Sequence, residues 1–327
     1  MTAEPILYLL AGLILLFTGG EFLVRGGVSL ASNFKISTLV VGVTVVSFGT
    51  SAPELVVSIE AAISGHPDIA MGNVIGSNIA NIALVLGLTM VIMPVVIDSK
   101  SLMFNISVMI GVSFLLLFFV VFDNKLFWWQ GMILFTLLIV FVWHSIRKSR
   151  INLRNGIGEI PERKYSLPVS IIIIIISCIG LVFGARFLVN GATEVARTIG
   201  VSERAISVSV IALGTSLPEL VTSAIAAFRK HSDISVGNII GSNIFNILGI
   251  LGVSSGILVI PGSKGENAIN ISEKMLGTDL MVCIGLSLLL LLFLLPLRRI
   301  KLGRYKGIVF MVIYVSYIYI VFHSDPF

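Results

Sequence analysis

Residues 42–87 read GVTVVSFGTSAPELVVSIEAAISGHPDIAMGNVIGSNIANIALVLG, and residues 207–252 read SVSVIALGTSLPELVTSAIAAFRKHSDISVGNIIGSNIFNILGILG. The two stretches align without a gap at a constant offset of 165 positions, which pairs Glu54 with Glu219 and Asn81 with Asn246. Each stretch has an acid directly after a proline and, further along, a segment rich in glycine, serine and asparagine. Such self-similarity indicates that the chain contains two copies of one structural unit.

The rest of the chain is also strongly apolar, with 56% hydrophobic and 12% charged residues. A water-soluble core of this length could not bury so much apolar surface, so the composition indicates a protein whose solvent is lipid. Uninterrupted apolar runs such as Ile171–Ile176 exclude the alternating pattern of a membrane barrel. We therefore expect an all-α polytopic membrane protein. Stretches of the ~20 residues needed to cross ~30 Å of hydrocarbon occur about ten times, at residues 5–25, 38–63, 69–94, 102–121, 127–146, 168–190, 204–228, 234–260, 276–296 and 305–323.

One long polar interruption, residues 147–167, divides the chain into a first half (1–146) and a second half (168–327). Each half holds about five spans by the same length criterion. Because an odd number of crossings leaves the chain on the opposite side, the second half enters the membrane from the other face. The sequence therefore predicts two inverted five-helix repeats. The first apolar run lacks the basic leader and cleavage site of a signal peptide, so we expect it to be retained as a span.

Basic residues gather in three loops, at residues 147–164, 229–230 and 298–306. With ten spans these loops fall on one side of the membrane, which the positive-inside rule makes cytoplasmic. We expect a cell-membrane protein with both termini outside and the 147–167 linker in the cytoplasm. The net charge of +5 then reflects membrane topology and not nucleic-acid binding. Cys178 and Cys283 lie inside predicted spans and indicate neither a disulfide framework nor a metal site.

Glu54 and Glu219 lie within predicted spans, where an ionisable group costs several kcal/mol unless it has a partner and is therefore a candidate functional residue. A structural ion pair is the first alternative, although no lysine or arginine lies near either glutamate in these spans. A pair of protonated acids that donate hydrogen bonds is the second. The proline before each glutamate cannot bond the carbonyl four residues earlier, so we expect a broken helix with exposed carbonyl oxygens. Thr50 and Thr215, one turn before the acids, share their helix face.

The second part of each copy carries a polar stripe with a spacing of four residues, Asn73, Ser77 and Asn81 in the first copy. Asn238, Ser242 and Asn246 repeat it in the second copy. Hydrogen bonding between helices and contact with a cation are both possible roles, and we favour cation contact for the serines and for Asn81 and Asn246. Ca²⁺ prefers six to eight oxygen ligands, which carboxylates, carbonyls and amides supply. Zinc is disfavoured because no histidine or cysteine lies in these segments.

These paired motifs, GTSAPE with GNVIGSN and GTSLPE with GNIIGSN, resemble the two α-repeats of the sodium/calcium exchanger family, within the calcium/cation antiporter superfamily. The resemblance covers nearly the whole chain. It implies about ten helices, of which the first and sixth move across an ion-binding core. It implies that Glu54 and Glu219, with the carbonyls of Thr50 and Thr215, bind Ca²⁺. It further implies that Na⁺ uses these groups together with Ser51, Ser77, Ser216 and Ser242 and the carbonyls of Ser47 and Ala212, and that Asn81 and Asn246 line the centre. Some relatives carry aspartate where this chain has Asn246, so potassium co-transport is not expected.

We therefore predict a secondary antiporter that exchanges Na⁺ for Ca²⁺ by alternating access, needs no cofactor, and works in membrane lipid as a monomer. A site that holds either one divalent ion or several monovalent ions makes exchange obligatory. Proton/calcium exchange and a cation channel are the nearest alternatives. An intramembrane enzyme is disfavoured because no nucleophile–base pair is visible, and no phosphate-binding loop points to ATP.

Overall fold

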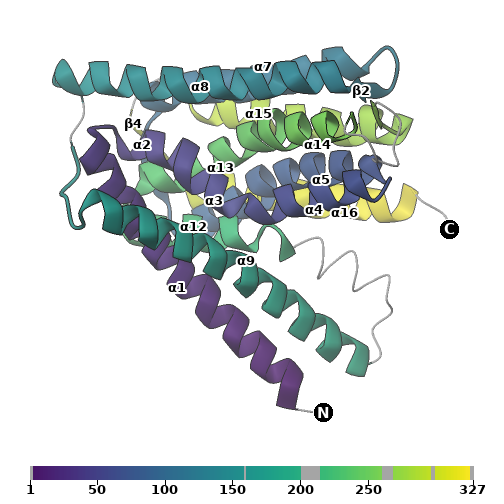
Figure 1. Cartoon of the computed structure of the whole chain (residues 1–327), viewed down its shortest axis with the longest axis horizontal. Coiled ribbons are helices and arrows are strands. Elements are labelled where there is room, and N and C mark those ends of the chain that lie inside the picture. Colours follow the sequence, from purple (N-terminus) through teal and green to yellow (C-terminus); the bar gives the residue numbers. More distant parts are fainter. Residues whose placement is uncertain (1–2, 158–159, 200–213, 260–267, 296–298, 325–327) are drawn as a thin grey trace. The chain divides into compact units, whose positions relative to one another are not determined.

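A computed structural model describes residues 3–157, 160–199, 214–259, 268–295 and 299–324 (Figure 1). The described chain is almost entirely helical. Its α-helices are α1 (Ala3–Phe34), α2 (Thr38–Val41), α3 (Ser47–Thr50), α4 (Ala52–Ile63), α5 (Pro67–Ala80), α6 (Gly87–Ile92), α7 (Ser99–Val120), α8 (Trp128–Arg154), α9 (Leu167–Thr198), α12 (Leu217–Phe228), α13 (Ser232–Phe245), α14 (Leu251–Ile257), α15 (Leu280–Phe293) and α16 (Arg304–Ser324). Four π-helical segments join them, η1 (Gly42–Val46), η2 (Asn81–Leu86), η4 (Asn246–Ile250) and η5 (Met275–Asp279).

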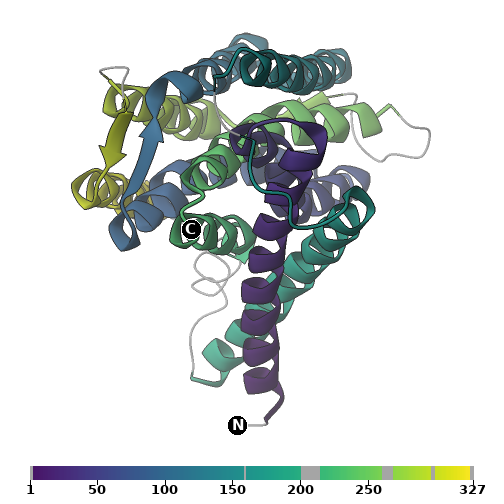
Figure 2. The ribbon, with the colours of Figure 1, turned by 90° about the vertical axis from the view of Figure 1, so that its left-hand side faces the viewer.

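Within the described ranges, four short strands form two antiparallel pairs outside the long helices. Strand β1 (Val95–Asp98) pairs with β4 (Arg299–Leu302), as the two arrows of Figure 2 show, with Val95 opposite Leu302. Strand β2 (Lys125–Phe127) pairs with β3 (Ala268–Asn270). Both pairs join segments that follow or precede long helices, and they pair backbone groups of these connecting segments.

Eight helices in the described ranges are long and apolar enough to cross a membrane, and a bent helix pair, Thr38–Thr50 with Ala52–Ile63, makes a ninth span. The one remaining predicted span, residues 204–228, begins outside the described residues, and its described part is α12. The prediction of an all-α polytopic membrane protein is confirmed. Two spans are buried over most of their apolar length, Pro67–Ile92 at 72% and Ser232–Ile257 at 89%, whereas the other continuous spans are 11–39% buried. These two central spans carry the glycine- and asparagine-rich part of each copy.

The chain forms two compact units, and each unit draws on both halves of the sequence. The first unit comprises Met1–Pro53 and Ser145–Asn238, and the second comprises Glu54–His144 and Ile239–Phe327. The first unit contains α1, α2, α3, α9 and α12. The second contains α5, α6, α7, α14, α15 and α16. Its buried core includes Ile79, Met90 and Ile106.

Helices α1 and α9 pack together along their length within the first unit (Figure 1). Added Cβ atoms show how close the backbones are: one on Gly184 would lie 2.9 Å from the Leu16 amide nitrogen, and one on Gly191 would lie 2.8 Å from the Pro5 carbonyl oxygen. Small residues recur every seven positions at this contact, at residues 12, 19 and 26 of α1 and at 170, 177, 184 and 191 of α9. We call this contact the glycine seam. Small residues are what lets membrane helices approach this closely.

The glycine seam also fixes the direction of the two helices. The C-terminal part of α9, at Gly191, lies against the N-terminal residues Pro5 and Leu9 of α1, while Gly26 near the end of α1 lies against Ser170 and Ile173. The helices are therefore antiparallel. They are also equivalent in the duplication, because Gly19 and Gly184 are 165 positions apart. Equivalent helices that run in opposite directions are the arrangement that inverted repeats require.

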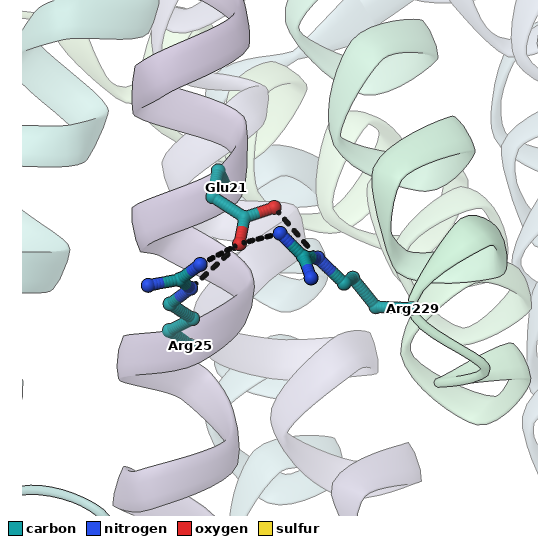
Figure 3. A network of polar contacts seen from close by, with 3 residues as sticks. All are labelled: Glu21, Arg25 and Arg229. Carbon is teal, nitrogen blue, oxygen red and sulfur yellow. Dashed lines mark hydrogen bonds and ion pairs between the residues drawn. The ribbon is translucent and has the colours of Figure 1, made fainter.

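A three-residue ion network ties α1 to the end of α12 in the same unit (Figure 3). Glu21 accepts hydrogen bonds from Arg25, one turn further along α1, at 2.6 Å, and from the Arg229 Nε at 3.0 Å. A second Arg229 nitrogen lies 2.7 Å from the carboxylate. Arg229 caps the C-terminus of α12, where a positive charge also interacts favourably with the helix dipole. The network thus joins residues 208 positions apart.

We expect Gly184→Ala to destabilise the protein by about 1–3 kcal/mol, because its new methyl group would meet the Leu16 backbone nitrogen at 2.9 Å. Gly180→Ala is the matched control, since its methyl group would come no closer than 4.0 Å to a neighbouring atom. Thermal unfolding of both variants in detergent tests this. Equal melting temperatures would contradict the close approach of α1 and α9 at Gly184.

Glu21→Gln removes the anion that two arginines share, and we expect it to lower stability by about 1 kcal/mol, the upper end for partly exposed ion pairs. Glu194→Gln is the control, because Glu194 contacts one arginine, Arg197, at 3.8 Å on the same helix. We expect the control to shift the melting temperature less than Glu21→Gln does. A larger shift for the control would contradict the proposed contribution of the Glu21 network to stability.

Candidate functional site

The motif that contains the first acid breaks its helix, as the sequence predicts. Helix α3 ends at Thr50, α4 begins at Ala52, and the two helices meet at an angle of 48°. Ser51 lies between them with φ −82° and ψ 9°, outside the helical region. Pro53 has no N–H for the Gly49 carbonyl, which accounts for the break. In the second copy α12 begins at Leu217, directly after Ser216, and the preceding residues up to 213 lie outside the described part.

One polar cluster belongs to the first unit and joins both sequence copies. The Ser51 hydroxyl donates to Glu219 Oε1 at 3.1 Å, and the Thr50 hydroxyl donates to Asn238 Oδ1 at 3.0 Å. Ser47 contributes its backbone carbonyl, which accepts from the Thr50 hydroxyl at 3.3 Å. All five side chains are buried, and Glu219 is fully removed from the surface. We call this set the Glu219 cluster.

A second set of buried polar side chains belongs to the second unit, on α4, on α5 and on the segment that follows Ile239. It contains Glu54, whose side chain is fully buried at the start of α4. The Asn73 amide donates to the Glu54 backbone carbonyl at 3.1 Å and to the Ser58 hydroxyl at 2.9 Å. Other predicted residues of this unit are buried as well, namely Ser77, Asn81, Ser242 and Asn246, while Asn73 is partly buried. We call this set the Glu54 cluster.

The hydrogen bond between Asn73 and Ser58 recurs in the other copy. There the Asn238 amide donates to the Ser223 hydroxyl at 3.0 Å, 165 positions further along at both ends. In each copy the bond ties the helix that carries the acid to the helix that follows it. Both asparagines therefore have the interhelical role that their spacing allowed.

The two central asparagines differ from these. The Nδ2 and Oδ1 atoms of Asn81 and the Oδ1 atom of Asn246 are buried without a hydrogen-bond partner in the described part of the chain. The same is true of the Ser216 hydroxyl. A buried polar atom left in this state costs about 1–3 kcal/mol. Unsatisfied buried oxygens are candidates to bind a cation, which accepts oxygen ligands from amides and hydroxyls.

Sequence reasoning missed two features of this region. First, π-helical segments begin at Asn81 and at Asn246, in equivalent positions of the two copies. Such segments are rare and often occur at functional sites. Second, Asn78 and Asn243 face each other, and the amide of each donates to the backbone carbonyl of the other, at 3.2 Å and 3.3 Å. The only available signal was that this asparagine is also repeated at the constant offset.

The predicted site residues fall in different places. Ser47, Thr50, Ser51, Ser216 and Glu219 belong to the first unit, and Thr215 lies there too, partly buried. Glu54 and the serines and asparagines of the Glu54 cluster belong to the second unit. Ala212 lies outside the described residues. Each unit thus provides one carboxylate together with hydroxyl and amide oxygens.

These donor sets are hard oxygen ligands. Among the residues that the structure describes, no three His, Cys, Asp or Glu side chains come together as a metal-binding group. Each set therefore contains one carboxyl group and several neutral oxygen donors. Such a set suits Na⁺ or Ca²⁺, which take oxygen ligands in tolerant geometries, better than it suits zinc, which prefers nitrogen and sulfur.

Comparisons with known proteins agree with this chemistry. A family model described as sodium/calcium exchanger protein matches residues 4–147 and 169–323. The sodium/calcium exchanger MaX1 of Methanosarcina acetivorans is 30% identical over 99% of this chain and 100% of its own length. An uncharacterized membrane protein of Methanocaldococcus jannaschii is 36% identical over 94% of this chain and 95% of its own.

A solved structure of the sodium-calcium exchanger NCX_Mj has a TM-score of 0.81 to this chain, with 33% identity and full coverage of both chains. Its similarity confirms the all-α membrane fold in two repeats. The resemblance noted in the paired motifs is confirmed by the family match, which covers both halves and leaves out the central linker. The chain belongs to the sodium/calcium exchanger family.

Proposed function

We propose that this chain is a secondary antiporter that exchanges Na⁺ for Ca²⁺ by alternating access, with the ions held near the middle of the membrane by the two duplicated motifs. The observation that carries the proposal is the fully buried carboxyl group in each copy, Glu54 and Glu219. The Glu219 carboxyl also accepts a hydrogen bond from the Ser51 hydroxyl of the other copy. Membership of the exchanger family supports it. Two carboxylates supply the two negative charges that balance one Ca²⁺.

In this proposal Glu54 and Glu219 bind Ca²⁺ together with the backbone carbonyls of Thr50 and Thr215. Asn81 and Asn246 line the centre, and their unpartnered amide oxygens support that role. Na⁺ uses the same carboxylates and further oxygens, so the two ions compete and each must leave before the other binds. The further Na⁺ ligands are Ser51, Ser77, Ser216 and Ser242 and the carbonyls of Ser47 and Ala212.

The contact between Ser51 and Glu219 supports a shared ligand set within the first unit. The hydroxyl that donates to the carboxylate at 3.1 Å can instead turn its lone pairs toward a cation, while the carboxylate binds the same ion. A bound cation would replace this hydrogen bond with two ion contacts. The Ser51 hydroxyl therefore has a partner both with and without a bound cation.

For alternating access we propose that α1 and α9 move as one pair relative to the ion-binding helices. The glycine seam supports this, because it holds the two helices in close backbone contact. The ion network of Glu21 connects α1 to α12, so the pair would not be independent of the helix that carries Glu219. Rigid-body movement of this kind is the usual route in transporters with inverted repeats.

We further propose a cell-membrane location with both termini outside and the linker in the cytoplasm, based on the basic loops. The repeats are residues 1–146 and 168–327, joined by the linker 147–167, whose first part continues α8 as far as Arg154. The protein is proposed to work as a monomer in lipid without a cofactor, because both motif copies are in one chain.

We expect Glu54→Gln and Glu219→Gln each to reduce Na⁺-driven Ca²⁺ uptake at least 100-fold, because each removes one of two charges that offset the ion. Glu60→Gln is the matched control: Glu60 lies on the same helix as Glu54, but its side chain is exposed. Uptake of labelled Ca²⁺ into liposomes that contain the purified protein and an outward Na⁺ gradient gives the measurement. Wild-type uptake in either of the first two variants would rule out the proposed ligands.

Ion replacement separates the proposed exchange from its alternatives. We expect Ca²⁺ uptake to stop when internal Na⁺ is replaced by choline, and a pH gradient without Na⁺ should not restore it. Uptake driven by the pH gradient alone would indicate proton/calcium exchange. A Ca²⁺ flux that follows the membrane potential whatever the internal ion would indicate a channel.

A further inference from the structure

We propose that Asn78 is a positioning residue that orients Asn246 so that the Asn246 carbonyl oxygen is presented to the transported cation. The inference rests on the proposed function, and it assigns a role to a residue that the motif analysis did not single out. It also makes the two central asparagines, Asn81 and Asn246, unequal although they are equivalent in the duplication.

The argument begins at a backbone carbonyl, which can only accept a hydrogen bond. The Asn78 side chain lies 3.2 Å from the carbonyl oxygen of Asn243, so its amino group must be the end that faces this oxygen. Since the other end of an amide is its oxygen, Asn78 Oδ1 points away from Asn243 and can only accept. The orientation of Asn78 is therefore fixed by the main chain and does not depend on another side chain.

The Asn246 amide is the next group in this series. It lies 3.0 Å from Asn78 Oδ1, which requires a donor, so the Asn246 amino group must face Asn78. The Asn246 oxygen is then forced to the opposite side. That oxygen is buried and has no hydrogen-bond partner in the described part of the chain. Asn78 thus determines which end of Asn246 is available as a cation ligand.

The anchor for this series is the main-chain carbonyl of Asn243 on α13. Asn243 returns the hydrogen bond, with its amide donating to the Asn78 carbonyl oxygen at 3.3 Å and lying 3.7 Å from the Met109 sulfur. Asn78, Asn243 and Asn246 are each no more than 1% exposed, so water does not compete for their amides. The three residues lie in the second unit, on α5, on α13 and at the start of η4.

The other copy lacks the corresponding contact. The equivalent of Asn78 Oδ1 is Asn243 Oδ1, which is buried without a partner in the described residues, and both amide atoms of Asn81 are in the same state. Asn81 can therefore turn either end toward an ion or a neighbour, whereas Asn246 cannot. Asn81 and Asn246 are equivalent in the duplication, but only the amide of Asn246 is held in one orientation.

The same contact explains why an amide suits position 246. An aspartate carboxylate there would place an oxygen at about the same 3.0 Å from the Asn78 oxygen, with no proton between them. Asn78 cannot turn to offer its amino group, because the Asn243 carbonyl already holds it. Asn78 therefore selects a neutral donor at position 246.

The test is a double-mutant cycle on Ca²⁺ uptake, normalised to folded protein. We expect Asn78→Leu to raise the KM for Ca²⁺ about as much as Asn246→Ala does, by roughly tenfold or 1.4 kcal/mol, with a smaller effect on the maximal rate. The double variant should be no worse than Asn246→Ala alone. The control is Asn243→Leu, which removes the side-chain amide at the equivalent position of the other copy. Its effect on KM should multiply with that of Asn246→Ala.

Replacement of Asn246 by aspartate gives a second test, in which loss of the Asn78 amide should improve uptake. We expect Asn246→Asp to impair uptake severely, and Asn78→Leu to lessen that defect because it removes the opposing oxygen. Multiplicative effects of Asn78→Leu with Asn246→Ala, or a larger defect in the combination with Asn246→Asp, would overturn the proposal. If Asn78→Leu does not fold, Asn78→Ala takes its place in both tests.

Cation-induced thermal stabilisation in detergent, measured with Ca²⁺ or Na⁺ alone, separates this inference from the proposed function. If Ca²⁺ stabilises the wild type but no Na⁺-driven uptake occurs, the proposed exchange function is wrong. The double-mutant cycle can then still be measured, with the Ca²⁺-induced shift in melting temperature as its readout. We expect that shift to be reduced equally in Asn78→Leu, in Asn246→Ala and in the double variant. If exchange occurs but Asn78 and Asn246 show no coupling in either measurement, the positioning role of Asn78 is wrong and the proposed function stands.

Discussion

Removing a carboxylate from water is costly, and this chain does so once in each of its two copies. Glu54 and Glu219 are both fully buried in helices whose other residues are largely apolar. The surrounding structure reflects this cost. Pro53 breaks the helix beside Glu54, the Ser51 hydroxyl donates to Glu219, and the two most buried spans of the described chain follow the two acids in sequence. A fold that only needed stability would place apolar residues at these positions. The buried charges are therefore the constraint that the rest of the architecture serves.

Much of this could be predicted from the sequence because the signals were local or repeated. The all-helical membrane fold followed from apolar segment length, and the broken helix at Ser51 followed from Pro53 alone. The duplication predicted inversion, which the antiparallel packing of α1 against α9 supports. The polar stripe on one helix face followed from a spacing of four residues, and its members Ser77, Asn81, Ser242 and Asn246 are buried. Each of these depends on residues a few positions apart or on a constant offset.

The features that were missed depend on contacts between distant segments. The Glu21 network joins residues 208 positions apart, and no periodicity connects them. Spacing could not decide between cation contact and helix packing for Asn73, because both roles place a polar residue on the same face. Nor could it distinguish Asn246 from Asn81, since the difference arises from Asn78 at 3.0 Å on another helix. Sequence symmetry predicts equal environments, whereas packing makes them unequal.

The Glu21 network has one further consequence. Counting 165 positions from Glu21 leads to Arg186, and counting back from Arg229 leads to Ser64, so the second copy has no counterpart of this pairing. Two identical inverted copies would give a carrier whose inward-open and outward-open forms have the same free energy. A charge cluster without a symmetry-related counterpart removes that degeneracy, so the two end states of the proposed carrier would differ in free energy before any ion gradient acts.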